Sequence, residues 1–485
     1  MAWEEIESGV YRAEFGGSEK IYHRVGGLFA HLKKEHYRVH CVCSLEFGSD
    51  FQGRDPATAV KEAWKTLRTE LPTLGVIADG STHKVYRVLD AQGEQDWLDQ
   101  TFFLEPPGKT SNEVIAREPS DFPTLHFLPS SSEVVFLCSH WRIDALGTNW
   151  VLDRLFTLLA TPKAAKPVPP TVDSISPALE EAYGAPDPWT REQEDYARSH
   201  IQRFRENSFP NDRLRYKGDA KTPPGNPVRA TIIFTPESTA SLIAACKSHN
   251  ISATTATMSA LGQAVFALAD IDDREPKREK YDYTFATSIN VRPKLRPPYH
   301  SRAHATQTYV AGTGCRVRRG ASLIESAQAL RQHFKATYDD DRILQSLRAI
   351  YKFNSDATPV NQKKKEGAPS GTLPTPEGPA PAAPASPPPP PSNITISSLG
   401  IIDEYVTGEY GKGADGKPAV RVREYNFGID MMTRQMVTYV GTFRGRLQLA
   451  VSYNDGYYDK DVPKDVLIRV KEALAQGLGL ELEAS

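Results

Sequence analysis

The 485-residue sequence lacks several features that mark particular classes of protein. It has no run of about 18 apolar residues, which excludes a single transmembrane helix. Its first residues, MAWEEIES, are acidic and lack the basic and apolar regions of a secretory signal. The five cysteines include no CxxC spacing, so neither a disulfide framework nor a zinc cluster is expected. We therefore expect a reduced, cytoplasmic protein that holds no metal ion.

The chain also lacks an excess of charge of either sign. It has 58 lysines and arginines against 60 aspartates and glutamates, a formal net charge of −2. Without a basic field on the scale of a domain, we expect no nucleic-acid partner, and no membrane partner either. The length suffices for two large domains whose cores need no disulfide or structural metal.

One segment differs in composition from the rest. Residues 359–391 contain 12 of the 37 prolines and end in five consecutive prolines. Such a stretch buries too little apolar surface to offset the entropy of ordering it. We expect a disordered Pro-rich insertion over residues 358–392. It is either a tolerated insertion or a ligand for the aromatic groove of a partner protein.

The remainder alternates strand and helix patterns and predicts an α/β protein. The first series has strands at 37–45, 83–89 and 133–139 and helices at 56–70 and 148–159. The second has strands at 228–234, 283–289 and 393–399, a strand-rich region at 435–453, and helices at 236–249, 253–269, 323–338 and 463–478. We predict an N-terminal lobe over residues 1–165 and a crossover linker over 166–226, with one helix at 191–205. The C-terminal lobe spans 227–485 and includes the insertion.

The sequence SHWRIDALG, residues 139–147, lies between a predicted buried strand and a predicted helix. A side chain at such a turn can project into a cleft, so His140 is a candidate for chemistry. Asp144, four residues later, can hold an arginine and fix the turn. The His-x-x-x-Asp spacing alone is a weak signal, because a lone histidine at a strand end is more often structural than catalytic.

This block resembles the histidine motif of the condensation-domain superfamily. That superfamily includes nonribosomal peptide condensation domains, plant BAHD acyltransferases, chloramphenicol acetyltransferase and fungal acetyltransferases acting on trichothecenes. Residues 234–254, 290–298 and 442–455 are similar to further stretches of the superfamily, in the same order. Ser139 stands where condensation domains carry a second histidine, and Ala145 where they carry glycine. The Asp-Phe-Gly-Trp-Gly motif of the plant branch is absent, so the fungal branch fits best.

The resemblance implies a two-lobed, chloramphenicol-acetyltransferase-like α/β fold with mixed sheets, helices and an active-site tunnel between the lobes. It implies a CoA-dependent O-acyltransferase of secondary metabolism, expected to be a cytoplasmic monomer. The enzyme would move an acyl group, expected to be acetyl, to a hydroxyl of a small natural product. Acyl-CoA would be a co-substrate, with no permanently bound cofactor. The partners would be acyl-CoA and a small-molecule alcohol, or a carrier protein as donor.

The resemblance also implies roles for individual residues. His140 would be the general base that takes the proton from the acceptor hydroxyl and returns it to the leaving thiolate. Asp144 would be structural and pair with Arg292. Ser397 and Ser398 are candidates for stabilising the oxyanion of the tetrahedral intermediate. No residues for binding CoA are predicted.

Two alternatives stay open. The same fold can accept a thioester from a carrier protein, or catalyse a cyclisation with His140 as a proton shuttle. Ser139 in place of a second histidine argues against peptide condensation. In the second alternative the chain is a non-catalytic member of the superfamily that binds a partner through its Pro-rich insertion.

Overall fold

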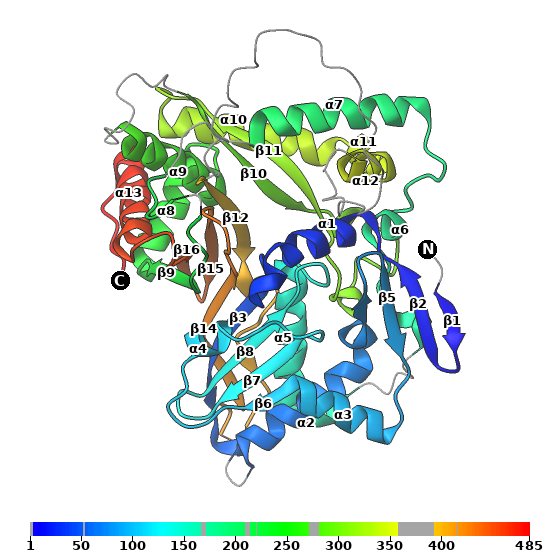
Figure 1. Cartoon of the computed structure of the whole chain (residues 1–485). Helices are drawn as coiled ribbons and strands as arrows, with labels where there is room; N and C mark the ends of the chain where they lie inside the picture. Colours follow the sequence, from blue (N-terminus) through cyan, green and yellow to red (C-terminus); the bar gives the residue numbers. More distant parts are fainter. Residues whose placement is uncertain are drawn as a thin grey trace.

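A computed structural model describes residues 3–51, 54–165, 171–208, 214–219, 221–270, 281–356, 392–413 and 415–485. The predicted Pro-rich insertion lies outside these residues, apart from Ser392 at its end. Two halves lie against one another, one built around a six-stranded sheet and the other around a four-stranded sheet (Figure 1).

The strands of the described chain are β1 Glu4–Glu7, β2 Val10–Glu14, β3 Val39–Phe47, β4 Ile77–Asp79, β5 His83–Arg87, β6 Phe102–Leu104, β7 Thr124–Leu128, β8 Glu133–Cys138, β9 Pro227–Ile233, β10 Tyr283–Asn290, β11 Val310–Val317, β12 Ile394–Ile401, β13 Glu409–Tyr410, β14 Val420–Ile429, β15 Met436–Phe443 and β16 Arg446–Asn454. The α-helices are α1 Gly17–Gly26, α2 Pro56–Glu70, α3 Ala91–Thr101, α4 Ser111–Ile115, α5 Ala145–Ala160, α6 Leu179–Tyr183, α7 Arg191–Ser208, α8 Pro236–Ser248, α9 Ala253–Asp270, α10 Leu323–Asp339, α11 Arg342–Gln345, α12 Leu347–Asp356 and α13 Asp461–Leu478.

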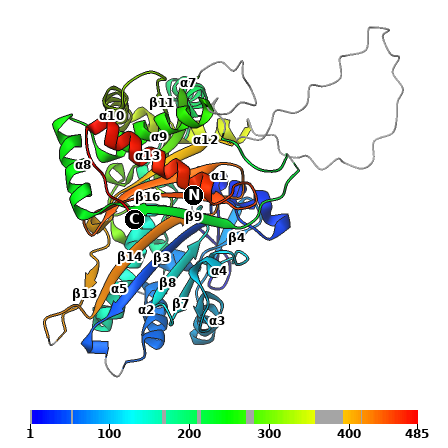
Figure 2. The same ribbon diagram turned by 90° about the vertical axis from the view of Figure 1, so that its left-hand side faces the viewer.

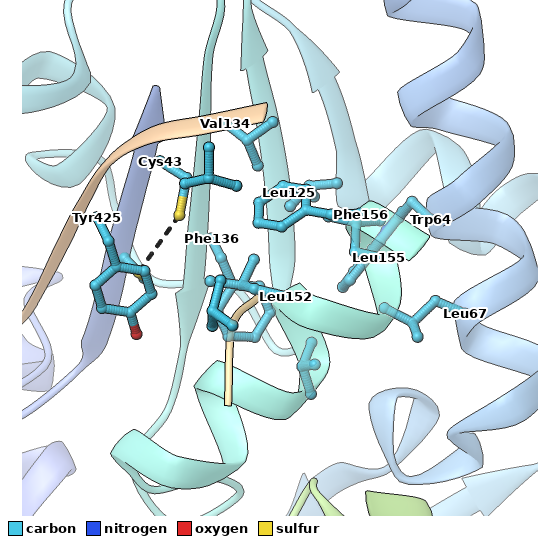
Figure 3. Packing of buried hydrophobic residues seen from close by; sticks show 14 of the residues in the cluster. Cys43, Trp64, Leu67, Leu125, Val134, Phe136, Leu152, Leu155, Phe156 and Tyr425 are labelled. Carbon is cyan, nitrogen blue, oxygen red and sulfur yellow. Dashed lines mark hydrogen bonds between the residues drawn. The ribbon is translucent and has the colours of Figure 1, made fainter. Parts of the chain in front are cut away.

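The six-stranded sheet of the first half has the order β13-β14-β3-β8-β7-β6. Only β6 and β7 pair in parallel; the other neighbours are antiparallel. Leu152, Leu155 and Phe156 of α5 pack on Val134 and Phe136 of β8 (Figure 3). These buried apolar side chains fix α5 against the sheet and so fix the turn that precedes the helix. A separate sheet, β1-β2-β5-β4, lies at the edge of this half.

The four-stranded sheet of the second half has the order β12-β15-β16-β9, with β12 and β15 parallel. Helices α8, α9 and α13 pack against it around a second apolar core. Strands β10 and β11 form an antiparallel pair beside β12. Side chains join β10 to β12: Tyr283 Oη donates to the Ile394 carbonyl at 2.7 Å and Thr287 Oγ1 to the Ile396 carbonyl at 2.7 Å.

Strand β14 comes from the C-terminal part of the chain but belongs to the sheet of the first half. It pairs antiparallel with β3, with Tyr425 opposite Cys43, and Figure 2 shows β14, β3 and β8 side by side. The fold therefore departs from a strict division at residue 227, because residues 409–429 complete a sheet that is otherwise built from residues 39–138. Helix α7, within the predicted linker, packs on β10 and β11.

The described part of the chain contains no single helix that is long and apolar enough to cross a membrane. Helices α8 and α9 together meet the criteria of length and composition, but they are bent by 95° with respect to each other.

A buried ion pair anchors the end of β14. Asp430, directly after the strand, accepts from Arg38 Nε at 2.8 Å and lies 2.8 Å from His40 Nδ1, both on or beside β3. The Asp430 side chain is only 2% exposed. These bonds join residues about 390 positions apart in the sequence. Because they are buried, water cannot take the place of either partner if one is removed.

We predict that Asp430→Ala lowers the free energy of unfolding by about 3–5 kcal/mol, because it leaves Arg38 buried without its counter-charge. Denaturant unfolding measures the loss. Asp465→Ala is the matched control, since it removes a half-exposed ion pair with Arg469 at the surface of α13 and is expected to cost less than about 1 kcal/mol. Equal losses in the two variants would contradict this prediction.

Candidate active site

The turn between β8 and α5 carries both His140 and Asp144. Asp144 is the N-cap residue of α5, and its Oδ1 accepts the backbone N–H of Gly147 at 2.8 Å. This bond satisfies one of the free N–H groups of the first turn. Helix α5 therefore starts at Ala145, three residues before the predicted start at Thr148. The motif is the end of a strand, a tight turn and a capped helix.

The second carboxylate oxygen of Asp144 faces the other half of the molecule. Oδ2 accepts from Arg292 Nη1 at 2.6 Å and from the backbone N–H of Tyr309 at 2.8 Å. Arg292 Nη2 donates to the carbonyl of Gln307 at 2.9 Å. Asp144 and Arg292 are 3% and 1% exposed. The structure thus brings these two predicted residues together, and both carboxylate oxygens are occupied by structural bonds.

Gly147 lets the two halves approach at this point. A Cβ atom at residue 147 would lie 2.2 Å from the carbonyl oxygen of Ala305 and 3.2 Å from Arg292 Nη2. A larger residue would therefore push α5 away from the segment that holds Asp144. The glycine of the SHWRIDALG block is explained by this close approach.

His140 is held by residues from separate parts of the chain. Its ring stacks on that of Tyr22 in α1, with centroids 4.2 Å apart and an angle of 15°. Thr308 Oγ1 donates to the backbone carbonyl of His140. Nδ1 is buried and makes no hydrogen bond of standard geometry to any residue that the structure describes. The imidazole therefore has a fixed position without a direct side-chain hydrogen bond at Nδ1.

Burial determines the charge of His140. Loss of solvation lowers the pKa of the ring below its usual 6.5, while backbone groups of His140 and Ile143 and the carboxylate of Asp144 act in the opposite direction. The ring is thus uncharged at neutral pH. An uncharged imidazole can accept a proton from a hydroxyl group.

A cavity of about 530 Å³ lies between the two halves. His140 lines it from the first half, and Ser397 and Ser398 of β12 line it from the second. The hydroxyl oxygens of Ser398 and Thr254 lie 2.9 Å apart, so Ser398 already has one hydrogen-bond partner. The volume lies within the ~300–1,000 Å³ range of small-molecule sites. The structure therefore places all three predicted polar residues on one cavity.

Four tyrosines line this cavity, and the sequence analysis identifies none of them: Tyr22, Tyr37, Tyr405 and Tyr439. Tyr22 lies in α1 and stacks on His140; Tyr37 has a φ of 65°, which is uncommon for tyrosine. Burial raises the pKa of both phenols, so both are uncharged at neutral pH. No sequence motif marks Tyr22, because only the tertiary fold places α1 against the turn.

Ser139, the departure from the condensation motif, points elsewhere. Its Oγ donates to Glu35 Oε2 at 3.2 Å, and both residues line a separate cavity of about 80 Å³. Burial raises the pKa of Glu35. Ser139 is not among the residues that line the cavity of His140.

Within the described ranges, no group of three or more histidine, cysteine, aspartate or glutamate residues is arranged to hold a metal ion. The five cysteines are buried and unpaired.

Comparisons with known proteins find relatives that are similar over nearly the whole chain. No family profile matches the sequence. The chain is 37% identical to the O-acetyltransferase pigM of Monascus ruber, over 100% of this chain and 88% of that protein. It is 32% identical to the azaphilone biosynthesis cluster protein M of Aspergillus terreus, over 98% of this chain and 97% of that protein.

A solved structure shares the fold. The trichothecene 15-O-acetyltransferase TRI3 of Fusarium sporotrichioides superposes with a TM-score of 0.73 at 15% identity, and the match covers 98% of this chain and 97% of that one. The predicted α/β, two-lobed, condensation-like fold is confirmed by this similarity.

We predict that Asp144→Asn lowers the free energy of unfolding by about 3–5 kcal/mol, because Arg292 then lacks its counter-charge in the interior. The double variant Asp144→Asn/Arg292→Met removes both charges and is expected to recover part of this loss. Denaturant unfolding of the wild type, both single variants and the double variant measures the coupling. Losses that simply add would contradict a direct interaction between the two residues.

Proposed function

The chain belongs to the family of fungal O-acetyltransferases that includes pigM, and we propose that it transfers an acetyl group from acetyl-CoA to a hydroxyl group of a small secondary metabolite. The azaphilone class, which the Aspergillus terreus relative carries in its name, is the first class of acceptor to test. The observation that carries the proposal is the uncharged, half-buried His140 on the cavity between the two halves.

The proposed reaction uses one imidazole twice. Because Nδ1 is buried, Nε2 is the nitrogen that can reach a substrate. Nε2 takes the proton of the acceptor hydroxyl as its oxygen attacks the thioester carbonyl carbon. The tetrahedral intermediate then collapses: the carbon–sulfur bond breaks, and the imidazolium returns the proton to the leaving thiolate. The products are the acetyl ester and free CoA.

The oxyanion of the intermediate needs hydrogen-bond donors that are already in place. We assign this role to Ser397 and Ser398, because β12 carries both residues to the cavity that His140 lines. Asp144 and Arg292 are positioning residues in this proposal. Both residues line the cavity, but both oxygens of Asp144 are engaged in buried bonds, to the Gly147 N–H and to the second half of the molecule, so we assign them the role of holding the turn of His140.

We predict that His140→Ala lowers kcat for acetyl transfer by about 10²–10⁴-fold, because the general base is lost, while acetyl-CoA still binds. Product formation is measured with a hydroxyl-bearing azaphilone, and donor binding by calorimetry. His31→Ala, which replaces an exposed histidine, is the control and is expected to keep wild-type activity.

Three results would count against the proposal. Full activity of His140→Ala would remove the general base from the mechanism. If the wild-type protein binds no acyl-CoA but accepts an acyl group from a carrier-protein thioester, acyl-CoA is not the donor. A product without an added acyl group would indicate a cyclisation instead of a transfer.

The pH dependence of kcat/KM follows from the lowered pKa of His140. The neutral ring is the active form, so we expect kcat/KM to be constant at neutral pH and to fall as the pH drops through a value below 6.5. The profile is recorded with acetyl-CoA and a fixed acceptor. An acidic midpoint clearly above 6.5 would show that burial does not control the titration.

A further inference from the structure

A second cavity of about 330 Å³ adjoins the active-site cavity. Five residues line both spaces: Ile21, Tyr22, Phe204, Val310 and Gly312. Tyr22 also stacks on the ring of His140. The second cavity therefore begins next to the proposed general base, and these shared residues line both spaces where the two cavities meet.

The second cavity is apolar over most of its wall. Beyond the shared residues, its apolar wall includes the half-buried Ile201 of α7 and the buried Ile343, Leu347 and Ile350 of α11 and α12. The exposed Arg205 is the charged residue of the lining, which also includes the polar residues Ser18, His200, Tyr351 and Asn354. Burial lowers the pKa of His200, also on this wall, to about 4. That ring is uncharged at neutral pH. Such a wall suits an uncharged, apolar ligand.

Glycines on β11 set the position of Phe204, one of the residues that line both cavities. A Cβ atom at Gly312 would lie 3.2 Å from the ring of Phe204, and one at Gly314 would lie 2.9 Å from Asn207 Cβ. The two glycines thus let α7 lie close on β11. Helix α7 therefore forms one side of the second cavity, and α12, which packs against α7, forms another.

We propose that the second cavity binds a hydrocarbon chain that is part of the alcohol acceptor. This inference rests on the proposed acetyl transfer. The acyl part of the donor is a two-carbon acetyl group, and the amide-rich pantetheine arm and the charged nucleotide of CoA are polar, so the apolar wall of the second cavity suits none of them. The additional apolar space next to that cavity therefore serves the other substrate, and the enzyme is specific for alcohols that carry an apolar chain near the reacting hydroxyl.

The test uses the full-length enzyme and 1-alkanols from butanol to dodecanol as probes, with binding measured by calorimetry in the absence of a donor. We expect the affinity to rise about fourfold per added methylene until the cavity is filled. Ile201→Trp fills part of the cavity. It is expected to weaken the binding of long alkanols about 15-fold, which corresponds to roughly two lost methylene contacts, and to leave short alkanols unaffected.

Gln202→Trp is the matched control, because Gln202 is the exposed neighbour of Ile201 on α7 and does not line the cavity. It is expected to keep the wild-type affinities. Ile201→Phe replaces Ile201→Trp if the latter does not fold, as judged by circular dichroism. Equal chain-length profiles for the wild type and the Ile201 variant would overturn the proposal.

A second arm separates the two substrates. The affinities of acyl-CoA donors from acetyl-CoA to decanoyl-CoA are measured for the wild type and the same variants. A loss in Ile201→Trp that appears in the donor series and not in the alkanol series would overturn the proposal by placing the chain on the donor. Alkanol binding needs no turnover. A protein that binds alkanols as expected but transfers no acetyl group would therefore refute the proposed function, and this chain-binding site would stand.

Discussion

The buried ion pair between Asp144 and Arg292 is the interaction on which the arrangement of the site depends. Asp144 begins α5 with one oxygen and joins the second half of the molecule with the other. His140 lies only four residues earlier, and its backbone carbonyl is held by Thr308, again from the second half. The position of the imidazole is therefore set where the two halves meet. A substitution at Asp144 or Arg292 is therefore expected to change activity through this junction, without a role in the proton transfer itself.

The same junction accounts for the chemistry that we propose. Burial between the halves removes solvent from the ring of His140 and keeps it uncharged at neutral pH. The stacked ring of Tyr22 limits its motion. Strand β12 carries hydroxyl groups to the opposite wall of the cavity. Tyr22 and Phe204 line both this cavity and the apolar second cavity. One tyrosine in this way both positions the proposed base and forms part of the boundary of a chain-binding space.

Local signals predicted most elements because these signals act over a few residues. Asp55 and Pro56 start α2, and Thr235 and Pro236 start α8, as cap and first-turn residues do. The start of α5 was placed too late, since Asp144 was interpreted only as a partner for an arginine and not also as a helix cap. The resemblance pointed to His140, Asp144 and Arg292. Pairing of β14 with β3 and stacking of Tyr22 on His140 join distant segments, so no local periodicity encodes them.

The central claim is that acetyl transfer takes place at His140 between the two halves. A crystal structure of the full-length enzyme with bound acetyl-CoA tests it most directly. We predict that the thioester lies in the 530 Å³ cavity, with its carbonyl carbon beside the imidazole and its carbonyl oxygen directed toward Ser397 and Ser398 on β12. A thioester bound in a cavity that His140 does not line would contradict the account.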